Sequence, residues 1–331
     1  MHLPTAWFAV IAFLWTGYFV LEGFDFGVGM LLPVLARDQD QRGTMLHTIA
    51  PLWDGNEVWV ITAVGATFAA FPDWYASLLS GFYLPLLLII LALIVRGVGL
   101  EYRGKRDEPS WRRRADAAIT VGSLLPALGW GAIFAAMVRG VPLDAAHTDT
   151  GAAGGLLHPF VLLGAVCTLA LFATHGAIFL ALKTGGAPRE RARRLALRLG
   201  PAAAALLAAY LGWTLHLRYT PVAAILAAAA VACLCGALLA TVRGRDGWAF
   251  TGAAATIVLT MAALFGTLYP DLLPSTIDPA NSLTVTNAAS SPYTLKIMTW
   301  AAAVFTPVVL LYQAWTYWVF RKRIMVPAPP H

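Results

Sequence analysis

Nine long apolar runs constrain this chain more than any other feature of its sequence. They lie at about 6–36, 47–71, 74–99, 116–138, 158–183, 195–216, 222–242, 248–269 and 293–320. As an α-helix, about 20 apolar residues cross the roughly 30 Å hydrocarbon core of a bilayer. The alternating segments of about 10 residues that mark a transmembrane β-barrel are not visible. We therefore predict an all-α membrane protein with nine transmembrane helices.

The composition agrees with a membrane protein, because only 12% of the residues are charged, against about 25% in soluble domains. The first apolar run has no basic segment before it. It also continues far past the roughly 7–15 residues of a signal-peptide core. We expect this run to be retained as the first transmembrane helix.

The distribution of Lys and Arg predicts the orientation. With the N-terminus outside, 20 of the 23 Lys and Arg residues fall in cytoplasmic segments, with Arg96 counted as the start of one of them. Arg139, Arg218 and Lys296 remain outside. Basic residues concentrate on the cytoplasmic side of membrane proteins. The split predicts an external N-terminus and a cytoplasmic C-terminus, and it explains the net charge of +6 without a nucleic-acid partner.

The spacing of the runs suggests how the helices group. We expect a first four-helix unit over 1–140, a second over 155–270, and an external loop, a peripheral ninth helix and a cytoplasmic tail over 271–331. No internal repeat is evident. Trp315, Tyr317 and Trp318 lie near the end of the last run, where interfacial aromatic anchoring explains them.

Four acidic residues set the first two runs apart from the rest. Glu22 and Asp25 lie in the first run, and Asp54 and Glu57 lie in the second. Each pair is spaced i, i+3 and therefore shares one helix face. At 1.5 Å per residue, Asp25 lies about 28 Å from the outer end of its run and Asp54 about 10 Å from the inner end of its own. All four can thus form one cluster in the cytoplasmic half of the membrane.

Two functions fit these acids. Carboxylates inside a membrane commonly form proton relays, so the cluster can be a proton path. The acids can instead lock two helices together through hydrogen bonds to Asn56, Trp53, Trp59 or the backbone. The residue pattern alone leaves both interpretations open.

The sequence announces no redox centre of its own. Membrane haems usually need axial His or Met ligands, and only His175 lies well inside a run. An internal hydrogen bond is its expected role, with a cofactor contact as the alternative. Cys167, Cys233 and Cys235 lack metal-type spacing, and we predict no metal site in this chain. An electron-transfer role would therefore need a partner chain.

Several segments resemble subunit II of cytochrome bd-type quinol oxidases. The two most specific are L-E-G-F-D-F-G-V-G-M at 21–30 and I-A-P-L-W-D-G-N-E-V-W at 49–59. Further similar segments are F-A-A-F-P-D-W-Y-A at 68–76, G-F-Y-L-P at 81–85, Y-P-D-L-L-P-S-T at 269–276 and S-S-P-Y-T-L-K-I-M-T-W at 290–300. The resemblance covers nearly the whole chain, although 140–245 is generic.

The resemblance implies a subunit of a bacterial cytoplasmic-membrane oxidase that is haem-free and not catalytic alone. Its partner, subunit I, would carry two haems b, haem d and the quinol-oxidising loop. The complex would oxidise quinol and reduce O2 to water with cytoplasmic protons, so that it builds a proton gradient without pumping. A quinone bound in this subunit and small single-span accessory subunits are also known in the family, and membrane lipids would surround the complex.

The resemblance also bears on the acids. Asp54 in W-D-G-N resembles a family residue associated with proton delivery, and Asp25 belongs to the other matching motif. Glu22 and Glu57 are added from spacing alone.

Two rival functions remain. A proton-coupled transporter would act alone, but the inverted repeats and broken helices that transporters often have are not apparent here. A structural scaffold would use the acids only to hold helices together.

Overall fold

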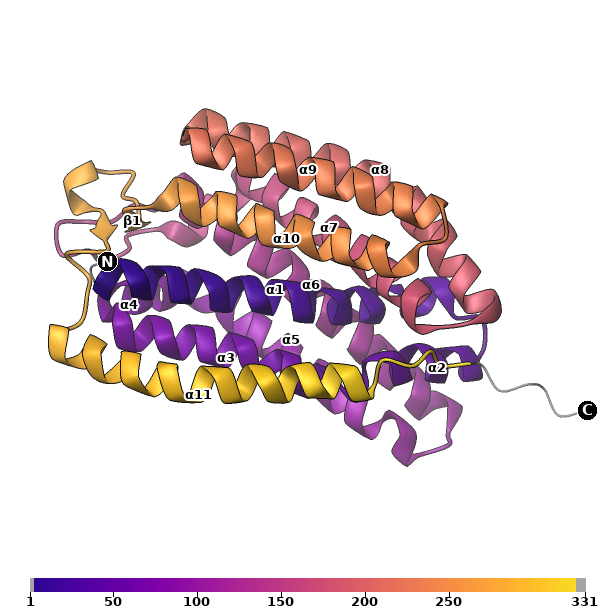
Figure 1. The fold of residues 1–331 in the computed structure, drawn as a ribbon. Helices are drawn as coiled ribbons and strands as arrows, with labels where there is room; N and C mark the ends of the chain where they lie inside the picture. Colours follow the sequence, from indigo (N-terminus) through magenta and orange to yellow (C-terminus); the bar gives the residue numbers. More distant parts are fainter. Residues whose placement is uncertain (1–2, 326–331) are drawn as a thin grey trace, which may run out of the picture.

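The structure, a computed structural model, describes residues 3–325 and is almost entirely helical (Figure 1). The α-helices are α1 Leu3–Leu35, α2 Gln39–Ile49, α3 Trp53–Ala70, α4 Pro72–Gly81, α5 Tyr83–Tyr102, α6 Pro109–Arg139, α7 Pro159–Lys183, α8 Gly186–Leu217, α9 Pro221–Val242, α10 Asp246–Leu268 and α11 Pro292–Val319. Strands β1 Asp271–Leu273 and β2 Leu283–Thr284 pair antiparallel in the loop before α11.

Eight helices of the described chain are long and apolar enough to cross a membrane. They are α1, α5 with the short turn that follows it, α6, α7, α8, α9, α10 and α11, and each coincides with a predicted run. The remaining run, 47–71, corresponds to α3. That helix has 18 residues, but its first turns carry polar residues and it is not among the eight.

Two predicted runs are each divided into two helices in the structure. The prediction of 47–71 as one helix was wrong, whereas a proline inside an apolar run, such as Pro85 in 74–99, is compatible with either a kink or a boundary. The run 47–71 is interrupted between α2 and α3 around Pro51, because Pro51 has no N–H to donate to the carbonyl of His47 four residues earlier. The run 74–99 is interrupted at Phe82 between α4 and α5. Pro85 has no N–H, so it cannot donate the helical hydrogen bond to the carbonyl of Gly81, four residues earlier.

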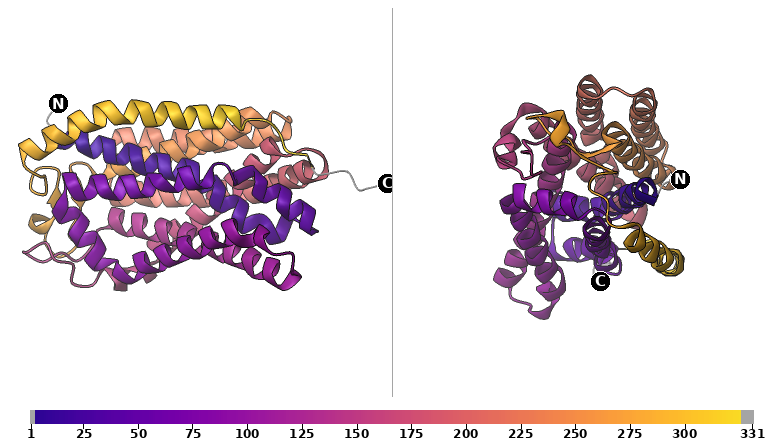
Figure 2. Two further views of the ribbon diagram at one scale, coloured as in Figure 1. Left: turned by 90° about the horizontal axis from the view of Figure 1, so that it is seen from below. Right: turned by 90° about the vertical axis from the view of Figure 1, so that its left-hand side faces the viewer.

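The long helices run side by side in one elongated bundle (Figure 2). Helix α1 lies in its middle and packs against α3, α6, α7 and α10, while α9 pairs with α10 and α8. The approach of α1 to α7 is very close, since a Cβ atom at Gly27 would lie 2.7 Å from the Cα atom of Gly176. These glycines let the backbones from the first and second halves of the chain touch.

Helix α11 lies at the margin of the bundle, beside α1 and α3 (Figures 1 and 2). Leu295 is the only buried residue of this helix, all of which the structure describes. The tail after α11 is pinned to the α7–α8 turn, where the Ile324 amide donates to the Lys183 carbonyl at 2.8 Å. Part of the predicted segment 271–331, namely 326–331, lies outside the described residues.

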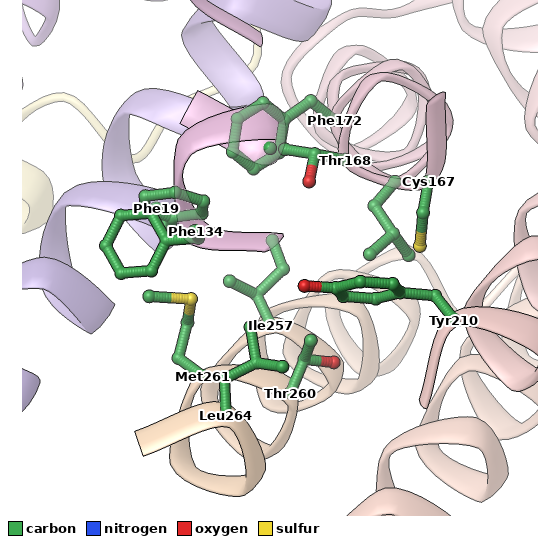
Figure 3. Close-up of a pocket in the computed structure, with 12 residues that line it drawn as sticks. Phe19, Phe134, Cys167, Thr168, Phe172, Tyr210, Ile257, Thr260, Met261 and Leu264 are labelled. Atoms are coloured by element: carbon green, nitrogen blue, oxygen red, sulfur yellow. The ribbon is translucent and has the colours of Figure 1, made fainter. Parts of the chain in front are cut away.

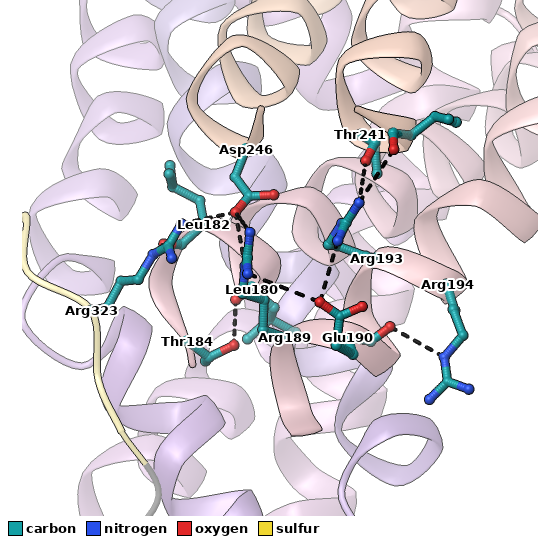
Figure 4. A network of polar contacts seen from close by, with 11 residues as sticks. Leu180, Leu182, Thr184, Arg189, Glu190, Arg193, Arg194, Thr241, Asp246 and Arg323 are labelled. Atoms are coloured by element: carbon teal, nitrogen blue, oxygen red, sulfur yellow. Dashed lines mark hydrogen bonds and ion pairs between the residues drawn. The ribbon is translucent and has the colours of Figure 1, made fainter. Parts of the chain in front are cut away.

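Basic side chains gather at the end of the bundle that holds the α5–α6, α7–α8 and α9–α10 connections. Figure 4 shows one network there, in which buried Asp246 forms ion pairs with Arg189 at 2.7 Å and with Arg323 at 2.8 Å. The first residue of α10 is thus tied to the start of α8 and to the C-terminal tail. This end is the one that the distribution of Lys and Arg predicts to be cytoplasmic.

Candidate functional site

The charged centre of the bundle is a buried ion pair between α1 and α5. Arg96 of α5 donates to Glu22 of α1, and both side chains are completely buried. The guanidinium of Arg96 also lies 4.8 Å from the centre of the Phe26 ring. We had counted Arg96 as the start of a cytoplasmic segment, and this was wrong. A buried charge needs a partner of opposite sign, and the carboxylate that pairs directly with Arg96, Glu22, lies on α1.

Asp25 is held from the other side by an amide. The Asn56 Nδ2 group of α3 donates to Asp25 Oδ2 at 2.7 Å, and Asn56 and Asp25 are both fully buried. The Asn56 oxygen accepts hydrogen bonds from Gln313 Nε2 at 3.1 Å and from the Tyr317 hydroxyl at 2.8 Å, both on α11. Interfacial anchoring was therefore the wrong role for Tyr317, which bonds into the site.

Several polar atoms of this centre have no partner among the described protein groups. They are Glu22 Oε2, Asp25 Oδ1, and Nε and Nη2 of Arg96. Buried polar atoms in proteins nearly always have a hydrogen-bond partner. The centre thus retains capacity for bonds to water or to a transferred proton, which a fully satisfied helix lock would lack.

Asp54 and Glu57 lie in an apolar groove between α3 and α5. The groove has a volume of about 650 Å³. Asp54 is exposed at the groove, whereas Glu57 is half-buried and interacts electrostatically with both Asp54 and Arg96. The structure therefore brings Glu22, Asp25 and Glu57 around Arg96. It places Asp54 next to them on the accessible side.

Neither predicted tryptophan bonds to the acids in the described chain. Trp53 lines the groove, and its ring faces Gly97 of α5. Trp59 is buried with its ring 5.7 Å from that of Phe13. Of the three supporting residues suggested by the sequence, only Asn56 holds an acid.

His175 is held by a hydrogen bond to the backbone and by aromatic side chains. Its Nε2 atom lies 3.2 Å from the Val20 carbonyl oxygen. One face of its ring stacks on Phe250 at 5.0 Å, and Phe24 packs edge-on at 5.8 Å. The internal hydrogen bond expected from the sequence is present, and the ring is buried between two phenylalanines.

A small cavity lies in the bundle core. Its volume is about 20 Å³, enough for one water molecule. The Tyr210 hydroxyl points into it, and Phe19, Phe172 and Met261 close it (Figure 3). Within residues 3–325, no group of three or more His, Cys, Asp or Glu side chains is arranged to hold a metal ion.

The fold and the site define a multi-pass membrane protein with a buried charged centre near one end of its bundle. Residues 3–320 match the family described as cytochrome bd terminal oxidase subunit II. The chain belongs to this family, and it is accordingly a multi-pass protein of the bacterial inner membrane and a subunit of an oxidase complex, which implies a partner subunit I.

Individual relatives agree with this assignment. The chain is 39% identical to cytochrome bd ubiquinol oxidase subunit 2 of Bacillus subtilis, over 99% of this chain and 98% of the relative. It is 33% identical to cytochrome bd-I ubiquinol oxidase subunit 2 of Escherichia coli, over 96% of this chain and 94% of that protein. The fold matches a chain of the bd oxidase structure from Geobacillus thermodenitrificans with a TM-score of 0.77 at 18% identity, over 96% of this chain and 97% of that one.

Proposed function

We propose that this chain is a haem-free subunit II that supports a haem-bearing subunit I and supplies a cytoplasmic proton path to the oxygen-reducing site. Subunit I would hold two haems b and haem d. The complex would oxidise quinol, reduce O2 to water and build a proton gradient without pumping. The observation that carries the proposal is the series of acids that leads from the accessible groove to the buried ion pair of Arg96.

The series has an order set by exposure. Asp54 is exposed at the groove and Glu57 is half-buried beside it. Glu57 interacts with Arg96, which in turn holds Glu22, and Asp25 lies one helical turn from Glu22. A positioned carboxylate passes a proton across a hydrogen bond or one bridging water. Protons would thus move from Asp54 through Glu57 to Glu22 and Asp25.

Arg96 would stabilise the buried carboxylates inside the membrane without occupying all of their hydrogen-bonding positions. Isolated carboxylates inside a bilayer are costly. The charge of Arg96 interacts electrostatically with Glu22, Asp25 and Glu57 and offsets that cost. Within residues 3–325, however, the guanidinium donates a hydrogen bond to Glu22 alone among these acids. The other acids therefore retain lone pairs that can accept a proton.

The contacts of Asp54 favour a proton path over a helix lock. Asp54 forms neither a hydrogen bond nor an ion pair with any residue in 3–325, whereas Asp25 has a clear bond to Asn56. A lock through Asp54 has no contact to act through. Asp25 can hold α3 through Asn56 and also belong to the proton path, since its second oxygen Oδ1 has no hydrogen bond to a described group.

The groove beside the acids also suits a long apolar ligand. Its volume falls in the usual range of ligand sites, about 300–1,000 Å³, and its walls include Ile61, Leu86 and Ile90. We assign the bound quinone of this family, or a lipid chain, to this groove. The exposed apolar surface of α11 offers room for small single-span accessory subunits.

The test is Asp54→Asn in the purified complex. We expect normal assembly and haem content but loss of most quinol-driven O2 uptake. The matched control is Asp107→Asn, which removes an exposed carboxylate (97% exposed side chain) from a cytoplasmic loop, and which should behave as wild type. Uptake near the wild-type rate in Asp54→Asn would remove Asp54 from the path. Loss of assembly would support a scaffold.

A further inference from the structure

We infer that α11 is a positioning element for the buried site, and that Tyr317 and Gln313 act through the Asn56 amide to orient it toward Asp25. The inference rests on the proposed proton path, to which it adds two residues from the far end of the chain. Neither residue touches Asp25 in the network of hydrogen bonds, so both are positioning residues.

Helix α11 is placed by a few polar contacts. Nearly the whole helix is exposed, and it is held at its two ends by polar contacts. At one end Trp7 Nε1 lies 3.1 Å from the Thr299 hydroxyl oxygen. At the other, Gln313 and Tyr317 reach Asn56, and the Lys183 ammonium donates to the carbonyls of Phe320 and Lys322 just beyond the helix. Because α11 buries so little of its surface, we infer that these hydrogen bonds fix its position.

The hydrogen-bond partners of Asn56 fix the orientation of its amide. An Asn side chain has one oxygen that accepts and one NH2 group that donates, and which way it points is set by its partners. Two donors from α11 converge on the Asn56 oxygen. The NH2 group must then face α1, where it donates to Asp25 Oδ2 at 2.7 Å and to the Leu21 carbonyl at 3.4 Å.

The orientation of the Asn56 amide determines whether the ionised or the protonated form of Asp25 is stabilised. An NH2 group facing a carboxyl oxygen stabilises the ionised form, whereas an amide turned over would present its oxygen and stabilise the protonated form. The two α11 donors hold the first arrangement. The charged or titratable groups that face Asp25 are Glu22 on its own helix, Glu57 on α3, Arg96 on α5 and Tyr317 on α11.

The experiment uses the whole complex with Tyr317→Phe, which removes one hydroxyl and keeps the ring. Tyr312→Phe is the matched control, because Tyr312 lies on the same helix and is 65% exposed. We expect Tyr317→Phe to slow quinol-driven O2 uptake about fivefold, the effect of one neutral hydrogen bond. The dependence of uptake on pH should also change shape, with haem content unchanged. Gln313→Met, which keeps the length of the side chain, should act in the same direction.

A double-variant cycle shows whether the effect passes through the amide. In an Asn56→Leu background, Tyr317→Phe should cause no further loss, because coupled residues are not additive. The inference would be overturned if the losses of O2 uptake in the cycle were additive, or if the pH curve of uptake were only scaled down uniformly. Wild-type uptake rates in both Tyr317→Phe and Gln313→Met would overturn it too, as would a loss of assembled complex with no change in its rate of uptake. Asp25→Asn in the same assay separates the two proposals. Normal uptake in that variant refutes the proton path, whereas slow uptake there with normal Tyr317→Phe refutes only the role of α11.

Discussion

Replacement of Arg96 by Met should destabilise the subunit strongly. Arg96 and Glu22 are both completely buried, so the variant leaves one or more carboxylates in the bundle without a counter-charge. Loss of one partner from a buried ion pair costs about 3–5 kcal/mol, a change of roughly a hundredfold or more in the ratio of folded to unfolded protein. Stability is measured as the temperature at which the purified complex loses its haem spectrum.

The double variant Arg96→Met/Glu22→Leu tests the cause of that loss. Removing both charges of a buried pair is often neutral or stabilising, so the double variant should recover part of the lost stability. It should still be slow in O2 uptake, because a member of the proposed path is gone. Two results would refute the argument: wild-type stability in Arg96→Met, or a double variant as unstable as the two single variants combined.

Three further outcomes follow from named contacts. Gly27→Ala should cost about 1–3 kcal/mol by overpacking and lower the yield of assembled complex, because its Cβ would meet the Gly176 backbone; Gly65→Ala, with open space around it, should not. Glu57→Gln should leave the haem spectrum intact and slow O2 uptake, and equal rates would place Glu57 off the path. His175→Phe should preserve haem content in the complex, and loss of a haem band would reveal a ligand role that its packing argues against.

The sequence predicted the long helices well because apolar runs of membrane length have few other ways to fold. Seven predicted runs each correspond to one helix that can cross a membrane, and α5 covers most of an eighth. The interruption near Pro51 was not predicted, and the sequence left open whether Pro85 bends a helix or ends one. A window of apolar residues does not register where a missing N–H ends one helix and a second begins.

The acids were visible in the sequence because charge is rare inside apolar runs. Their partners were harder to find. Arg96 lies at the end of an apolar run, where a basic residue normally marks the cytoplasmic boundary, and only its burial beside Glu22 shows another role. The one sign in the sequence that Arg96 is buried was its position before four further apolar or small residues, Gly97–Leu100.

The contribution of α11 could not be predicted from residue spacing. Asn56 and Tyr317 are 261 positions apart, and their contact depends on how the last helix settles against α3. A Gln and a Tyr four residues apart, at 313 and 317, share one helix face. That pattern is a usable sign of a polar face, but it names no partner.

Proton uptake during reaction with O2 tests the central claim most directly. The fully reduced complex with Asp25→Asn is mixed with O2, and haem absorbance and proton uptake are followed together. We expect wild-type binding of O2 by the haems of the complex but slow proton uptake. Uptake from the medium at the wild-type rate in both Asp25→Asn and Asp54→Asn would show that protons reach the oxygen-reducing site without this chain.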